Sequence, residues 1–214
     1  IVSSAVIGDA HVLKNEGSWS WPNGPLQLVG SARAENGAGG TIQTSGGSVV
    51  AVSSTGARFD NGGTIDYDGA TASFVFEVPM NNTGSVAVSS GTLAALAGGT
   101  ANGGSFAADA GAVLRFGGAY LADPTSSITG PGRVSMHLGS TPGPVALTVQ
   151  GTYDVGTTVV RVGGLDVQAA SITTDSLIFE PFNSDPFIQG TGTVETTDLT
   201  WHQGQLLGCL LYTS

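Results

Sequence analysis

Three aspartates that lie close together, Asp60, Asp66 and Asp68, are the side chains best suited to binding a metal ion. Asp66 and Asp68 are two residues apart, so on a strand their carboxylates share one face. Calcium prefers several oxygen ligands of this kind. The nine-residue Gly-Gly-x-Gly-x-Asp repeat of calcium-binding rolls is missing from the sequence, however. The favoured interpretation is a solvated outer face around Tyr67, and the three aspartates are weak calcium candidates.

An interruption of the glycine pattern at residues 180–187 is the best candidate for a ligand-binding loop. It contains two prolines and two phenylalanines within eight residues. Loops held by a rigid scaffold often carry function. The side chains expected to contact a ligand are Phe182, Asn183, Asp185 and Phe187. A second proline-containing stretch, residues 141–144, is a further candidate loop.

Aromatic side chains offer a possible platform for stacking on sugar rings. The candidates are Trp19, Trp21, Tyr120 and Phe182. Trp19 and Trp21 alternate along a strand and therefore share one face. The favoured alternative is that these rings fill the core or cover its end.

The motifs that would indicate an enzyme are absent from the sequence. Polysaccharide hydrolases and lyases need convergent carboxylates, or a basic residue near bound calcium. The Asn-Thr-Asp, Asp-Asp, Gly-His-Gly and Arg-x-Lys motifs typical of pectin hydrolases do not occur. His11, His137 and His202 have no partner at metal-ligand spacing. We therefore predict no catalytic residue and no cofactor.

The composition predicts an all-β protein with many short strands. The chain has 34 glycines among 214 residues and 40% hydrophobic residues, with only 10% charged. Glycine is typical of turns, and the abundant β-branched residues favour strands. A net charge of −10 argues against nucleic-acid binding, which needs a cationic surface. No apolar run is long enough for a membrane-spanning helix, so direct membrane insertion is not expected.

A triad of glycine, a small residue and an apolar residue recurs along the chain. Copies begin at Gly40, Gly63, Gly84, Gly104, Gly132, Gly151 and Gly192. Most steps are about 20 residues, and intermediate copies follow about seven residues later. This spacing predicts a parallel β-helix of about ten coils, each with three short strands, giving a rod of ~50 Å. A β-sandwich or roll is the alternative fold.

A six-residue motif occurs near both ends of the sequence. Residues 21–26 and 201–206 both read Trp-x-x-Gly-x-Leu and start 180 residues apart, at 21 and 201. We interpret them as equivalent positions of a super-repeat of about nine coils.

Several segments together resemble those of long bacterial surface proteins. They are the Trp-x-x-Gly-x-Leu motif and residues 61–65, 103–118, 128–134 and 151–156. The chain resembles β-solenoid proteins of the adhesin and autotransporter-passenger type, including filamentous-haemagglutinin-like rods. The resemblance covers most of residues 17–208. It implies a right-handed parallel β-helix and an exported, extracellular or cell-surface protein, and it supplies no catalytic residues.

The chain is expected to have three parts. Residues 1–16 form an irregular lead-in or a preceding coil, and residues 17–208 form a single solenoid segment of a longer protein. Residues 209–214 match the translation of a common transposase-type sequencing adapter, so this tail and its Cys209 are expected to be non-native. The chain is then expected to be an internal fragment encoded by a longer, metagenome-like gene.

The expected function is a structural or adhesive rod without catalysis. Its expected partners are glycans, a host or neighbouring cell surface, and flanking solenoid repeats of the same chain. The alternative is a carbohydrate-binding or polysaccharide-active β-helix protein.

Overall fold

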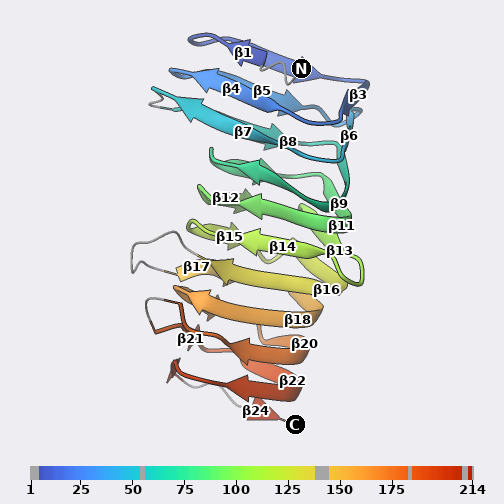
Figure 1. Cartoon of the computed structure of the whole chain (residues 1–214). Helices are drawn as coiled ribbons and strands as arrows, with labels where there is room; N and C mark the ends of the chain where they lie inside the picture. The colour runs from blue at the N-terminus through green and yellow to red at the C-terminus, as the bar shows by residue number, and fades with distance from the viewer. Residues whose placement is uncertain (1–4, 54–55, 138–144, 183–184, 209–211, 214) are drawn as a thin grey trace.

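The chain winds into a β-solenoid of about nine turns with about 21 residues per turn. The computed structural model describes residues 5–53, 56–137, 145–182, 185–208 and 212–213, and all regular elements in these ranges are strands. Figure 1 shows the turns stacked from the N-terminus at one end to the C-terminus at the other. The predicted parallel β-helix is confirmed, with slightly fewer and longer turns than expected, and the sandwich alternative is wrong.

Two parallel sheets run the length of the stack. The first is 14-stranded and consists of β1 (Ala5–Ile7), β3 (Ser18–Trp21), β4 (Pro25–Val29), β6 (Thr41–Thr44), β7 (Gly47–Val52), β9 (Thr64–Phe76), β11 (Ser85–Ala95), β13 (Ser105–Ala108), β14 (Val113–Phe116), β16 (Ser127–His137), β18 (Thr152–Val162), β20 (Ser171–Phe179), β22 (Thr193–Trp201) and β24 (Tyr212–Thr213). The second is 10-stranded and consists of β2 (Val12–Asn15), β5 (Arg33–Asn36), β8 (Arg58–Asn61), β10 (Met80–Asn82), β12 (Gly99–Ala101), β15 (Tyr120–Ala122), β17 (Val145–Val149), β19 (Gly164–Val167), β21 (Phe187–Gly190) and β23 (Gln205–Gly208).

Three strand segments per turn enclose the core, as the seven-residue sub-period predicts. Strands β3 and β4 are separate, whereas in β9 and β11 the two corresponding segments join into one long strand. Strands β1 and β2 pair with β4 and β5, so residues 5–15 take part in both sheets. No helix that could cross a membrane occurs in the described ranges.

Each position of the glycine triad forms its own column along the stack. The small residue faces outward, as in the pairs Thr41↔Thr64 and Thr64↔Ser85, and the next residue faces the core, as Ile65 does. The glycine lies where adjacent turns come closest. A Cβ on Gly84 would lie 2.0 Å from the carbonyl oxygen of Gly63, and the φ of Gly84 is not left-handed. These glycines are therefore required by close backbone contact and not by special dihedral angles.

One triad assigned from the sequence belongs to another column. Arg133, in the copy that begins at Gly132, pairs with Val113 in the second segment of the turn. The first segment of that turn instead has Ser127 and Ile128 opposite Ser105 and Phe106. Serine at 126 replaces the glycine there, so the sequence does not show this copy as a glycine triad.

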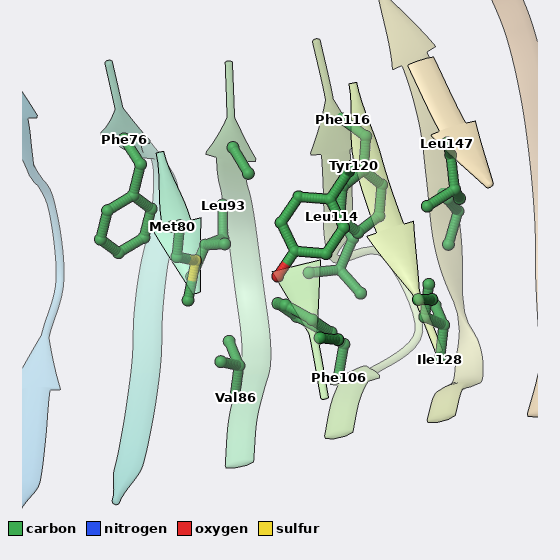
Figure 2. Close-up of a cluster of buried hydrophobic side chains, with 14 of the residues drawn as sticks. Phe76, Met80, Val86, Leu93, Phe106, Leu114, Phe116, Tyr120, Ile128 and Leu147 are labelled. Atoms are coloured by element: carbon green, nitrogen blue, oxygen red, sulfur yellow. The ribbon is translucent and has the colours of Figure 1, made fainter. Parts of the chain in front are cut away.

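Aromatic rings fill the middle of the core (Figure 2). Tyr120 packs against Phe116 and Phe106 with ring centroids 4.9 and 5.8 Å away. Its side chain is buried, and its hydroxyl donates to the Thr100 carbonyl oxygen at 3.1 Å. Burial raises the pKa of this phenol. Tyr120 is thus a core residue and is not available as a sugar platform.

The two N-terminal tryptophans also face the core. Trp19 and Trp21 stack with ring centroids 4.9 Å apart, and Trp21 makes an edge contact with Phe74 at 5.0 Å. Trp21 is 7% exposed, and its indole N–H donates to the Gly24 carbonyl oxygen. The pair closes the first turns of the core, in agreement with the core interpretation of these rings.

The two Trp-x-x-Gly-x-Leu segments are not structurally equivalent. Trp21 ends the first segment of its turn and pairs with Thr44. Trp201 ends the second segment. Following the paired residues from turn to turn leads from Trp201 through Phe179 to Leu26, and not to Trp21. The interpretation of these motifs as one super-repeat is therefore wrong.

A ladder of asparagines occupies one corner of four successive turns, and the sequence reasoning missed it. The side-chain amides of Asn15, Asn36 and Asn61 each donate to the amide oxygen of the next member at 2.8 Å, and the ladder ends at Asn82. Asn36, Asn61 and Asn82 are at most 1% exposed. The ladder stabilises the corner because each buried amide finds partners on neighbouring turns. Ala101 takes this position in the fifth turn.

Candidate functional site

A polar groove on the outer surface of the first sheet contains two of the three candidate aspartates. Asp66 and Asp68 are exposed and flank the buried Tyr67, as strand alternation predicts. The groove has a volume of about 340 Å³. Its lining residues come from β3, β6, β9, β11 and the turns after them: Ser20, Pro22, Gln43, Thr44, Ser45, Asp66, Tyr67, Asp68 and Ser89.

Strand register creates the groove from residues that are distant in the sequence. Ser20 pairs with Gln43, and Gln43 pairs with Asp66, so the three side chains follow one outward column. The hydroxyl of Ser90 donates to the Asp68 carboxylate. Burial raises the pKa of Tyr67, whose hydroxyl donates to the Ala72 carbonyl oxygen. The groove therefore offers carboxylates, an amide and hydroxyls, all of which can hydrogen-bond to a polar ligand.

Asp60 lies apart from this groove, on strand β8 of the second sheet. Its carboxylate pairs with the guanidinium of Arg58 at 2.9 Å and accepts a hydrogen bond from the Asn81 amide at 2.8 Å. No cluster of three or more metal-ligating side chains occurs within the described ranges. The calcium hypothesis that groups Asp60 with Asp66 and Asp68 is therefore not supported by their positions, because they lie on different sheets.

The candidate loop begins with residues held against the preceding turn. Glu180 accepts a charged hydrogen bond from Arg161 at 2.9 Å, and the backbone N–H of Phe182 donates to the Arg161 carbonyl oxygen. The ring of Phe182 is 51% exposed and lies against His137, with centroids 5.7 Å apart. The structure thus brings Phe182 together with two basic residues that the sequence reasoning left unassigned.

The other residues of the candidate loop take part in the solenoid framework. Phe187 begins β21, and its ring packs against Gly164, where a Cβ would lie 2.1 Å from the ring. Asp185 accepts a hydrogen bond from the Gln203 side chain. Asn183 and residues 141–144 lie outside the described residues, so those candidates stay predictions.

Comparisons with protein-family models, with curated proteins and with solved structures found no match for this chain. The fold defines it as a parallel β-solenoid repeat protein. The resemblance to adhesins and autotransporter passengers remains a prediction.

Proposed function

We propose that this chain is a structural and adhesive rod segment of a secreted or cell-surface bacterial protein, without catalytic activity of its own. The observation that supports this proposal is the unbroken stacking of parallel strands along both sheets. A stack of about nine turns at ~4.8 Å is a rod of ~45 Å with a repeated lateral surface. Such a surface suits display and multivalent contact.

A bead-adhesion assay tests the rod proposal. Beads coated with the folded chain are expected to be retained on bacterial or host cell layers, or on immobilised glycans. Beads coated with the heat-unfolded chain give the background. Retention at background on every surface, or release of sugar products from polysaccharides incubated with the chain, would contradict the proposal.

Both ends of the rod expose residues of the core ladders. In the second sheet, Leu13 and Leu206 are the terminal members of an inward column and are 37% and 44% exposed. Interior members such as Phe59 and Ile188 are at most 1% exposed. Exposed apolar edges favour pairing with another strand. We propose that further solenoid coils, from the same chain or from another copy, cover such edges.

The open edges lead to a prediction about self-association. The isolated chain is expected to form end-to-end oligomers, measurable by analytical ultracentrifugation at micromolar concentration. The Leu13→Lys, Leu206→Lys double variant should shift the population to monomer, because charge disfavours edge pairing. Leu121→Lys, at an outward position in the middle of the rod, is the control. An equal response of both variants would contradict association through the ends.

The second candidate function is binding of a neutral carbohydrate in the groove that contains Asp66. The supporting observation is the convergence of Asp66, Gln43 and Ser20 from three successive turns beside a hollow of about 340 Å³. Carboxylates and amides at fixed spacing can bind sugar hydroxyls, and a groove of this size accommodates a few sugar units.

A matched pair of aspartate variants tests carbohydrate binding. Asp66→Ala is expected to weaken binding of a neutral oligosaccharide by about tenfold, because a charged hydrogen bond is lost. Asp154→Ala is the control, since Asp154 is exposed and occupies the same outward column four turns away. The measurement is calorimetry against glucan, mannan and galactan oligomers, with and without EDTA. Equal losses for both variants, or binding that needs calcium, would contradict this function.

A further inference from the structure

Three basic side chains meet on the outer surface of successive turns. Arg115 is on β14, His137 ends β16, and Arg161 is near the end of β18. Arg115 pairs with Ser135, and His137 pairs with Val162, directly after Arg161. The three side chains therefore start within about two strand spacings and two residues, or ~12 Å, of one another. In keeping with this, burial and the two neighbouring guanidiniums lower the pKa of His137.

The positive charge of this group is only partly compensated. Glu180 pairs with Arg161 at 2.9 Å, while Arg115 has no ion pair within the described residues. The stretches that follow His137 and Phe182 in the sequence, 138–144 and 183–184, contain no charged residue. The basic group thus contrasts with the rest of a chain whose net charge is −10.

The outer surface beside Arg115 is shielded from water. The residues paired with Arg115 on the adjacent turns are Ala94 and Ser135, and Val159 follows one turn further. By strand alternation these positions face away from the core, yet they are only 2%, 5% and 1% exposed. The Nε atoms of Arg115 and Arg161 are buried without a hydrogen-bond partner in the described part of the chain. Unpaired buried donors are costly, and charge interactions are stronger where water is excluded. Both observations point to an anionic ligand.

Phe182 adds an apolar face beside these cations. Its ring is half-exposed and lies 5.7 Å from the His137 ring. An exposed aromatic ring next to guanidinium groups fits a ligand with an apolar ring face and an anionic substituent. Sugars that carry a carboxylate or a sulfate have this combination.

We propose that Arg115, His137, Arg161 and Phe182 form a binding site for an acidic glycan. The guanidiniums hold the carboxylate or sulfate oxygens, and the sugar ring stacks on Phe182. Glu180 keeps Arg161 in position, and Arg115 supplies the uncompensated charge. This site is independent of the groove at Asp66 and of the rod proposal.

Calorimetry with the full chain tests the site with three probes: a galacturonate oligomer, a dextran sulfate oligomer and unmodified dextran. At least one acidic probe is expected to bind at least tenfold more tightly than dextran. Arg115→Gln should weaken that binding by about tenfold or more, because a charge-assisted contact is lost. Arg115→Lys should give an intermediate loss, since it keeps the charge but not the planar donor set. Phe182→Ala should also weaken binding while leaving the charge unchanged.

Arg133→Gln is the matched control. Arg133 is exposed on β16, about 13 Å along the strand from His137. It pairs with Val113 and so starts ~8 Å from Arg115, on the side away from His137 and Phe182, and its replacement removes the same charge from outside the proposed site. It should change the affinity less than twofold, and thermal unfolding should show that all variants fold. Equal losses for Arg133→Gln and Arg115→Gln, or no preference for acidic probes, would overturn the proposal. Binding of polyglutamate as tight as that of the acidic glycans would instead indicate an acidic peptide and overturn the glycan assignment.

The pH response distinguishes the role of His137. The charged groups around it are Arg115 on β14, Arg161 on β18 and Glu180 after β20. Sulfate stays charged between pH 7.5 and 5.0, so the affinity for dextran sulfate should rise several-fold as His137 becomes protonated. His137→Gln should remove this rise. An unchanged pH response in His137→Gln would overturn the assignment of His137.

Discussion

Replacing Gly84 by alanine is expected to lower the free energy of unfolding by about 4 kcal/mol or more. The added Cβ would lie 2.0 Å from the carbonyl oxygen of Gly63, an overlap that neither backbone can relieve without moving. The same contact sets the spacing of adjacent turns, where the Ser85 N–H donates to the Gly63 carbonyl oxygen at 2.8 Å. Relief of the overlap therefore separates strands and breaks their hydrogen bonds.

Thermal and urea unfolding, followed by circular dichroism, measure this effect. Gly17→Ala is the control, because a Cβ there meets no atom within 4 Å and the φ of Gly17 is not left-handed. This control should change stability by less than about 0.5 kcal/mol. If Gly84→Ala were as stable as Gly17→Ala, close contact would not be the reason for glycine in the triad.

Replacing Asn61 by alanine should have the second-largest effect, a loss of about 3 kcal/mol. The Asn61 amide accepts from Asn36 and donates to Asn82, both at 2.8 Å, in a site that is 1% exposed. Alanine removes both of these hydrogen bonds from a buried site and leaves a small cavity, while the Asn36 amide still donates to the Thr64 carbonyl oxygen and the Asn82 oxygen still accepts from the Gly84 N–H. Each lost hydrogen bond costs about 1–1.5 kcal/mol, and the cavity adds to the loss.

Asn102→Ala is the matched control for the ladder. Asn102 follows Ala101, which occupies the ladder column one turn after Asn82, and its side chain is exposed. Urea unfolding should show little change for this variant. A ladder that contributes nothing would give equal midpoints for Asn61→Ala and Asn102→Ala.

Much of the fold could be predicted because the repeat is local. In Gly63-Thr64-Ile65, three consecutive residues specify a close contact, an outward position and an inward position. The spacing of such triads therefore predicts the length of a turn. The prediction failed at Ser126, where serine takes the place of glycine, and for Trp201, whose column differs from that of Trp21.

The candidate sites were harder to predict, because they join residues from different turns. Strand alternation predicts that Asp66 and Asp68 face outward on either side of Tyr67. That Gln43 lies beside Asp66 depends on strand register, which the sequence does not show. Asp60 is near Asp66 in sequence, yet the turn between them places it on the other sheet. Because the length of a turn varies around 21 residues, counting residues along the sequence does not predict which residues pair across adjacent turns.

The sequence by itself determined the all-β character and the stacking of coils, because both depend on neighbouring residues, whereas the close contact that requires glycine in the triad was seen only in the structure. Only the tertiary structure decided which residues face each other across turns. The asparagine ladder, the groove at Asp66 and the basic group around Arg115 all arise in this way. The physical reason is that inter-turn hydrogen bonds and core packing fix the register, and one residue more or fewer in a turn changes every contact that follows.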